Sequence, residues 1–349
     1  MSKVNSKKIL GVFITLLFFI SGTKAQDAVF SQFYNSTLYL NPSLAGIEED
    51  FIFTSNFREQ WGSLIPYYTS QVSVIMPIYD SKHSKPLGHK GGVGLSLYND
   101  MAGLNENFKT IGATGNFAYN LPLDPKHVNV IYFGVQGGFI QKRIDTSTLE
   151  WGSQYNPYLG ASDATIIPTD NLDFRNKAYL DIGSGVFWWH NPVPSENQKV
   201  LSINSGLSVA HMNNPNESMI IDDLHRLPLL YKYHGGIVFK MGVHLTGSVN
   251  VLVAYQNSTS QQNFGSYLTY RFFASGSELF AENFVRLGAW YRVKDAAIML
   301  TEFETKKFKV GFSYDWNTST LRYNNLGINT YEVYFGIKFS QYGPPKSRY

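Results

Sequence analysis

The chain has 349 residues, a formal net charge of +3 and no cysteine, which excludes a disulfide framework, a thiolate metal site, a cysteine nucleophile and a lipidated cysteine anchor. The weak net charge decides nothing about nucleic acid, but no Arg/Lys cluster with interleaved aromatic residues occurs, so we expect no nucleic acid partner. The 23 Tyr, 25 Phe and 30 Gly residues suit long strands and tight turns better than helices.

The first segment, residues 1–25, has the features of a signal peptide. Three lysines up to Lys8 precede an apolar run from Ile9 to Ile20, and small residues lead to Ala25. The apolar run is well short of the about 20 residues that a membrane-spanning helix needs. We therefore expect cleavage between Ala25 and Gln26 and export of the mature chain.

Residues 26–50 follow and do not alternate cleanly between apolar and polar positions. Asn41-Pro42 marks a turn, and several aromatic and leucine side chains of the segment need burial. We expect this segment to pack at the mouth or in the interior of the structure that the following strands build.

From Phe51 onward the chain predicts about 14 strands. The hairpin from Tyr231 to Gln256 shows the pattern most clearly, because apolar and polar residues alternate on both sides of a short break at Gly242 to His244. The predicted strands run from Phe51 to Gln60, Tyr68 to Ile78, Gly92 to Asp100, Phe108 to Asn120, Val128 to Lys142, Ala178 to His190, Val200 to Met212, Tyr231 to Met241, Leu245 to Gln256, Asn263 to Ser275, Ala281 to Val293, Ala296 to Phe303, Lys306 to Trp316 and Asn329 to Phe339.

Strand length and loop length favour a membrane barrel over a soluble β-sandwich. Most of these strands exceed the usual ~5–6 residues of soluble strands and match the ~9–11 residues that cross a bilayer. Short and long connections tend to alternate, as in bacterial barrels with short periplasmic turns and long outer loops. The predicted fold is an all-β, transmembrane, antiparallel up-and-down barrel over residues 51–340 in the outer membrane, with a short tail at 341–349.

The parity of charged residues supports the same fold. Strands that face lipid tolerate charge only on the side that faces the lumen. The charged residues Lys232, Lys240, Lys307, Lys309, Asp315 and Lys338 all occupy the predicted inward parity. Bulky residues expected on that parity, Tyr267, Phe273, Phe284, Trp290 and Trp188, predict a narrow or plugged lumen rather than a wide channel.

Catalytic and metal-binding motifs are missing from the sequence. The eight histidines are scattered, and no His-Glu-x-x-His, Gly-x-Ser-x-Gly or phosphate-binding loop occurs. His234 falls on the inward parity, where a polar lumen residue is the simpler interpretation. We expect neither an enzyme nor a metal or cofactor site.

The sequence contains a set of short motifs in a fixed order. The motifs are Phe30-Ser31-Gln32-Phe33-Tyr34, Leu40-Asn41-Pro42-Ser43-Leu44-Ala45-Gly46, Asn56-Phe57-Arg58-Glu59-Gln60-Trp61, Gly92-Val93-Gly94, Asn99-Asp100-Met101-Ala102-Gly103, Ala118-Tyr119, Gln141 to Asp145 and Leu149 to Gln154. Together they resemble the PorP/SprF family of the type IX secretion system. The resemblance covers residues 27–155 well, while the C-terminal half is similar only as generic strands.

The resemblance implies an outer-membrane barrel of the Bacteroidetes phylum without catalytic residues. Some family members are needed for secretion, and others support the export or surface attachment of one large adhesin, including in gliding motility. The neighbouring machinery includes a periplasmic ring complex and a peptidoglycan-binding lipoprotein. A porin or small-molecule transporter remains the alternative function.

The family-motif residues have a structural interpretation that we prefer to a functional one. In this interpretation Arg58 and Asp100 form an ion pair in the lumen, and Asn41-Pro42 shapes the entry turn. The complete set is Phe30, Ser31, Gln32, Tyr34, Asn41, Pro42, Ala45, Gly46, Arg58, Gln60, Trp61, Gly92, Gly94, Asp100 and Gly103.

The long connection at 143–177 is the candidate surface for a protein partner. It offers Trp151, Tyr155, Tyr158, Phe174 and Arg175 in a stretch too long for a simple connector. We expect it to contact the secreted protein or the translocon, together with residues 213–230. The alternative is that these aromatic residues cap the barrel by packing over its own rim.

Overall fold

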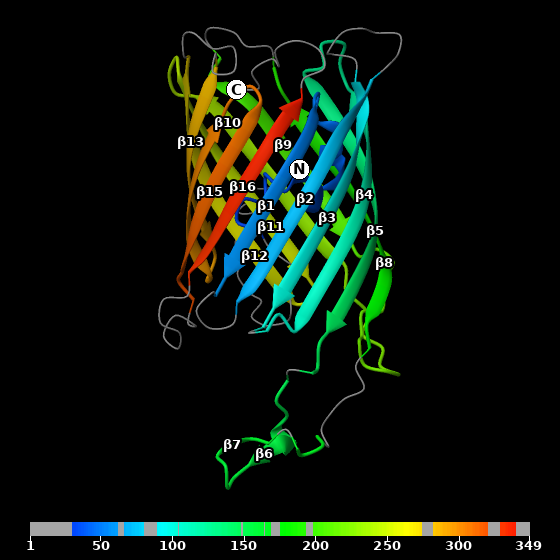
Figure 1. Cartoon of the computed structure of the whole chain (residues 1–349). Coiled ribbons are helices and arrows are strands. Elements are labelled where there is room, and N and C mark those ends of the chain that lie inside the picture. The colour runs from blue at the N-terminus through cyan, green and yellow to red at the C-terminus, as the bar shows by residue number, and fades with distance from the viewer. Residues whose placement is uncertain are drawn as a thin grey trace, which may run out of the picture.

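The computed structural model describes residues 30–61, 66–79, 89–103, 105–147, 149–163, 165–168, 175–192, 198–273, 282–319 and 329–339. Fourteen strands form a closed antiparallel barrel (Figure 1). They are β1 (Phe51–Gln60), β2 (Tyr67–Tyr79), β3 (His89–Ala102), β4 (Phe108–Pro122), β5 (Asn129–Ile144), β8 (Lys177–His190), β9 (Val200–Ala210), β10 (Leu230–Lys240), β11 (Leu245–Gln256), β12 (Thr259–Phe272), β13 (Asn283–Arg292), β14 (Ala296–Glu304), β15 (Phe308–Asn317) and β16 (Thr330–Phe339).

The topology is up-and-down, and β1 closes the barrel by pairing with β16. The short pair β6 (Tyr155–Asn156) and β7 (Ala161–Ser162) lies outside the barrel, in the connection between β5 and β8. The prediction of an antiparallel barrel of about 14 strands is confirmed. Because the barrel is closed, no sheet edge is left unpaired. A strand in a bilayer needs such pairing, since lipid cannot satisfy backbone hydrogen-bonding groups.

Alternation separates an apolar outer face from a polar inner face. On β10, Tyr233 and Ile237 are exposed on the outside, whereas His234 is buried inside. The predicted inward charges at Lys309 and Asp315 face the lumen, where both bond to other inner residues. The outer row is therefore suited to lipid and the inner row to water and polar contacts.

Three details differ from the sequence prediction. β9 ends at Ala210 rather than Met212, because His211 has a left-handed φ of 60° that interrupts the extended chain. Trp188 lies on the outward parity, and its neighbours Phe187 and Trp189 line the lumen instead. Phe273 lies beyond the end of β12 and is exposed.

The two ends of the barrel differ. We call the end where β1 begins and β16 ends the terminal side, and the opposite end the loop side. The connections β5–β8 and β9–β10 are on the loop side, and the first of them projects far from the barrel (Figure 1). The wall from β2 to β8 has strands of 13 to 16 residues, whereas β13 to β1 have 9 or 10, so the barrel is taller on one side.

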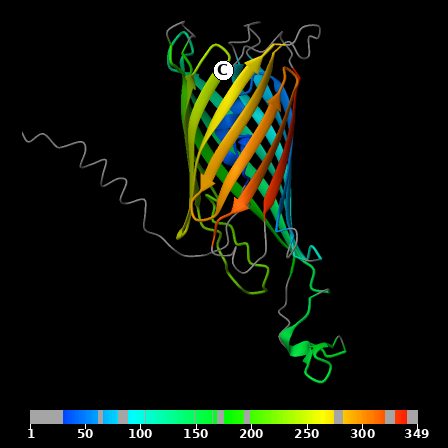
Figure 2. The ribbon, with the colours of Figure 1, turned by 90° about the vertical axis from the view of Figure 1, so that its left-hand side faces the viewer.

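Residues 30–47, which we call the plug, lie inside the barrel (Figure 2). The plug contains the short helix α2 (Thr37–Leu40) and the 3-10 helix η1 (Pro42–Gly46). Ser31 bonds to Glu332 near the loop-side end of β16, whereas Gly46 accepts bonds from His89 and Asn120 near the terminal side. The plug thus runs through the lumen from the loop side to the terminal side.

The register of β11 predicts that a charged substitution affects stability very differently at two adjacent positions. Val251 faces outward near the middle of the strand, and Asn250 lines the lumen. We expect Val251→Arg to lower the free energy of unfolding by roughly 2–4 kcal/mol and Asn250→Arg to lower it much less. Urea titrations of both variants refolded in lipid vesicles measure the difference, and equal losses would contradict this register.

Candidate functional site

Asn41 starts η1 and anchors the plug to the barrel wall. Its side-chain oxygen accepts bonds from the Ser43 backbone N–H (3.0 Å) and hydroxyl (2.6 Å), which makes it an N-cap, and Pro42 occupies the first helical position. Its amide nitrogen donates to the backbone oxygens of Val186 and Leu207 at 3.1 and 3.2 Å. The Asn-Pro turn is therefore both a local cap and a long-range contact.

Glycines on the wall allow the plug backbone to lie directly against the strands. A Cβ atom at Gly92 would be 1.9 Å from the Ala45 carbonyl oxygen, and one at Gly134 would be 2.1 Å from the Ser43 nitrogen. At Gly94 it would meet the Leu38 side chain. Because backbone atoms cannot rotate away, no other residue fits at Gly92 or Gly134 unless the plug moves.

A buried ionic network joins the start of the plug to four strands, β1, β13, β15 and β16. Arg58, 1 % exposed, contacts Glu332 at 3.2 Å, Asp315 at 3.3 Å and the Ser31 hydroxyl. Glu332 also accepts bonds from the backbone nitrogens of Ser31 (2.6 Å) and Gln32 (3.1 Å). The positive and negative charges of the network balance, because Arg292 also contacts Asp315 at 2.8 Å and adds a second arginine to the two carboxylates.

The expected ion pair between Arg58 and Asp100 is wrong. Arg58 is on β1 and turns toward β15 and β16, on the side away from β3. Asp100, on β3, lines a chamber on the loop side. The carboxylates that balance Arg58 lie more than 250 residues away in the sequence, beyond what strand alternation can predict.

A second polar contact holds the middle of the plug. Asn35 donates to Glu302 at 2.6 Å and accepts from Lys309 at 2.6 Å. Glu302 also pairs with Arg286 at 2.5 Å. Strands β13 to β16 and β1 thus present a charged wall to one face of the plug.

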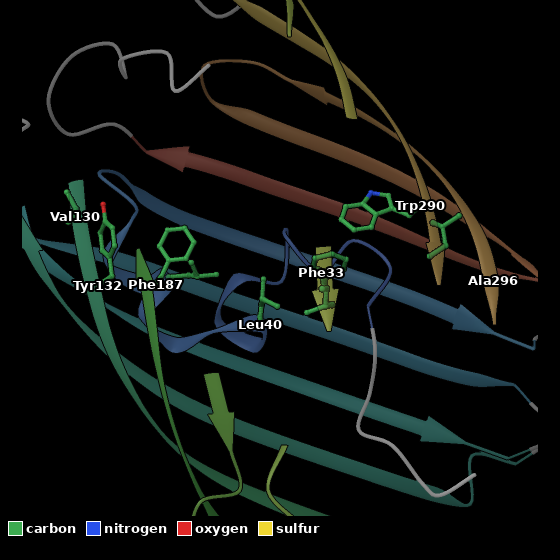
Figure 3. Close-up of a cluster of buried hydrophobic side chains, with 10 residues drawn as sticks. Phe33, Leu40, Val130, Tyr132, Phe187, Trp290 and Ala296 are labelled. Carbon is green, nitrogen blue, oxygen red and sulfur yellow. The ribbon is translucent and has the colours of Figure 1, made fainter. Parts of the chain in front are cut away.

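An apolar cluster also packs the plug against the barrel wall (Figure 3). Phe33 meets Trp290 with ring centroids 4.9 Å apart in an edge-to-face arrangement. Leu40 and Leu44 belong to the same cluster, which also contains Tyr132 and Phe187 of the wall. Burial of these apolar side chains adds a hydrophobic contribution to the stability of the docked plug.

Two chambers in the described part of the lumen are lined partly by the plug. The terminal-side chamber, about 240 Å³, has Tyr34 of the plug in its lining together with His234 and Arg286. The loop-side chamber, about 280 Å³, is lined by Tyr39 and Leu40 of the plug and by strands β2 to β5 and β8 to β10. Of the predicted bulky lumen residues, Tyr267 and Trp290 do face inward.

The remaining motif residues have local roles. Phe30 is buried against Tyr39 in an edge-to-face contact. Gly103 has a φ of +99°, which favours glycine at the β3–β4 turn. Gln60 ends β1 opposite Tyr67, and Trp61 follows it half-exposed with a φ of 58°. The expected cleavage site at Ala25 and Gln26 lies outside the described residues.

The described part of the β5–β8 connection forms a projection with exposed apolar side chains. η3 (Gly152–Gln154) and the β6–β7 pair build it, and Tyr158 at its tip is 97 % exposed. The hydroxyl of Thr165 and its backbone N–H hold the pKa of Asp163 below its ordinary value. The full exposure of Tyr158 is contrary to the alternative in which this residue caps the barrel rim.

The structure joins the two long loops at their base. The Arg175 backbone N–H donates to the Met219 oxygen at 2.9 Å, and Lys142 pairs with Glu217. Arg175 therefore lies at the base, whereas Tyr155 and Tyr158 lie on the projection, with Trp151 just before η3. Phe174 lies outside the described residues.

No group of three or more His, Asp or Glu side chains suited to a metal ion occurs in the described part of the chain. Among the same residues, no helix is long and apolar enough to cross a membrane. His211 donates from Nδ1 to the Asp181 carboxylate at 2.9 Å beside the loop-side chamber, a pair that sequence spacing did not indicate.

The closed barrel, with its apolar outer face and plugged polar interior, defines an outer-membrane β-barrel protein. Residues 22–337 match the family described as type IX secretion system membrane protein PorP/SprF. The chain belongs to this family, and the match extends well beyond the N-terminal half on which the resemblance rested.

Solved structures share the general architecture at low similarity. The CymD monoaromatic hydrocarbon channel is 11% identical, with 92% of this chain and 96% of that chain covered and a TM-score of 0.44. A Pseudomonas aeruginosa FadL homologue is 9% identical, with 87% and 93% covered and a TM-score of 0.43. Neither likeness carries an argument about function. No curated protein matches the chain.

Proposed function

We propose that this protein is a non-enzymatic component of the type IX secretion system that supports the secretion or surface attachment of a partner protein, such as a large adhesin. The family assignment supports the secretion system, and the exposed projection between β5 and β8 supports the partner. The loop side faces the cell surface in this proposal, because long connections are typical of the outer side of bacterial barrels. On the terminal side, the periplasmic ring complex and a peptidoglycan-binding lipoprotein are the neighbours that the family resemblance implies.

The plug supports a role in protein binding over the alternative role as a porin. A conducting pore needs a continuous polar channel. Here the plug is fixed to opposite walls by the Arg58 network and by the Asn41 cap. The residues available to bind a protein partner are therefore those on the outside of the barrel ends.

The projection has the composition of a binding surface. Tyr155, Tyr158, Leu159 and Ile167 are exposed in an otherwise polar loop, and aromatic anchors of this kind dominate the energetics of protein interfaces. Hydrogen bonds within the loop, such as Asn156 to Asp163 at 3.2 Å, pre-organise it, which lowers the entropy cost of binding.

Deleting residues 157–170 tests this role. We expect the barrel to remain at its normal level in the outer membrane and the partner to disappear from the cell surface, because the deletion removes the Tyr158 tip and leaves every barrel strand intact. Antibody labelling of intact cells measures the partner, and a heat-modifiability gel measures the folded barrel.

A milder pair of variants separates binding from folding. Tyr158→Ser removes the exposed ring at the tip, and Leu123→Ser removes an exposed apolar side chain from the β4–β5 turn at the other end of the barrel. Loss of display in the first variant alone supports the proposal. Normal display in both the deletion and Tyr158→Ser would refute the role of the projection.

A further inference from the structure

The loop-side chamber is a formed cavity that the proposed function does not use. Its volume is about 280 Å³, close to the lower limit for small-molecule sites. The plug residues Tyr39 and Leu40 form its base, and its walls come from seven strands. It lies at the end of the barrel from which the long loops extend.

The charged groups of this chamber are already held within the protein. Lys232 donates to the Tyr39 backbone oxygen at 2.7 Å and lies 3.9 Å from the centre of its ring. Lys142 pairs with Glu217, and Asp181 holds His211. Asp100 also interacts within the protein. A charged ligand would have to compete with these contacts, which favours an uncharged one.

Uncharged hydrogen-bonding groups remain available. Gln71, 4 % exposed, donates from its amide nitrogen to the Ser96 hydroxyl at 2.8 Å, which fixes the side chain. Its side-chain oxygen has no hydrogen-bond partner among the described residues. A buried acceptor without a partner is unfavourable, so a ligand hydroxyl that donates to it is expected to bind favourably. Thr110 and Thr114 add hydroxyls to the same lining.

Aromatic rings complete the lining. Tyr98 lies over Gly112, where a Cβ atom would be 2.1 Å from the ring, so the ring rests against the wall. Tyr67, Phe108 and Tyr179 also line the chamber. The negative face of an aromatic ring attracts weakly positive C–H groups, such as those on the flat side of a pyranose.

A peptide is a poorer match for this chamber. One common way in which an extended peptide binds is by adding a strand to a free sheet edge. The strands behind this chamber already pair on both sides, as β4 does with β3 and β5. We propose that the loop-side chamber binds a short uncharged saccharide, with Tyr98 as the stacking ring and Gln71 as the acceptor for a sugar hydroxyl.

Saturation-transfer NMR on the full mature chain tests the proposal in a detergent without a sugar head group, such as lauryldimethylamine oxide. The probes are mannose, N-acetylglucosamine and lactose, with glucuronic acid and a neutral tripeptide as comparison ligands. We expect transfer to at least one neutral sugar, and about tenfold weaker affinity in Tyr98→Ala and Gln71→Met, the loss for one good contact.

Tyr119→Ala is the matched control, because Tyr119 is on the neighbouring strand β4 and faces outward. A heat-modifiability gel verifies that each variant is folded. Absence of transfer to every neutral sugar, or transfer that both chamber variants leave unchanged, would overturn the proposal. Preference for glucuronic acid or the tripeptide would also overturn it. The isolated chain suffices, so the result is independent of the proposed partner.

Discussion

We expect the plugged barrel to conduct little, and we expect replacement of Gly134 by valine to make it conduct. The new Cβ atom would be 2.1 Å from the Ser43 nitrogen and 2.5 Å from the Pro42 carbonyl carbon. Both are backbone atoms, which cannot avoid the clash by a side-chain rotation, so the plug has to leave its position. An empty barrel of 14 strands encloses a polar lumen, and we expect conductance in planar bilayers to rise roughly tenfold or more.

Gly137→Val provides a control on the same strand. Gly137 faces outward, and a Cβ atom there meets nothing within 4 Å among the described residues. This variant should conduct like the unmodified protein. If Gly134→Val folds and conducts no more than Gly137→Val, the plug is not what closes the lumen. A large stable conductance in the unmodified protein would instead support the porin alternative.

Replacing Arg58 by methionine should be among the most destabilising single substitutions in the chain. It removes the cation that contacts Glu332 at 3.2 Å and Asp315 at 3.3 Å, where neither carboxylate has access to bulk water. Removing one partner of a buried ion pair costs about 3–5 kcal/mol, because the remaining charge is uncompensated. Urea unfolding in lipid vesicles measures the change in the free energy of unfolding.

An exposed ion pair supplies the comparison. Lys109 contacts Glu106 at 3.0 Å, but both side chains are more than 40% exposed, so Lys109→Met should cost about 0–1 kcal/mol. Adding Glu332→Gln to Arg58→Met should recover part of the loss, since it removes one uncompensated charge. Equal stabilities of Arg58→Met and Lys109→Met would show that the buried network contributes little.

The barrel could be predicted from the sequence because its repeating unit is local. Alternation in a stretch such as Tyr231 to Gln256 fixes which side chains share a face, whatever the partner strand is. The clearest failure occurs where both parities carry the same residue type. Phe187, Trp188 and Trp189 are consecutive aromatics, so pattern alone cannot determine which of them face the lumen.

The candidate site was less predictable because its contacts are long-range. The motif residues Ser31 and Asn41 are in the plug and Gly92 is on β3, and only the closed barrel brings the plug against its partners on the wall. Arg58 was correctly placed on the inward face but given the wrong partner, since its carboxylates are on β15 and β16. The projecting loop could be identified by its length, whereas the exposure of Tyr158 required the structure.

The direction of the plug has a consequence for how the chain folds. Ser31 and Gln32 are near the N-terminal end of the described residues, and their acceptor Glu332 is on β16. This strand also pairs with β1 to close the sheet. Docking of the start of the plug and closure of the barrel therefore both require the last strand. The hydrogen bond between Ser31 and Glu332 joins residues that are 301 positions apart, so we expect slow folding. Until the last strand pairs, the backbone nitrogens of Ser31 and Gln32 lack the acceptor that they bind in the closed barrel.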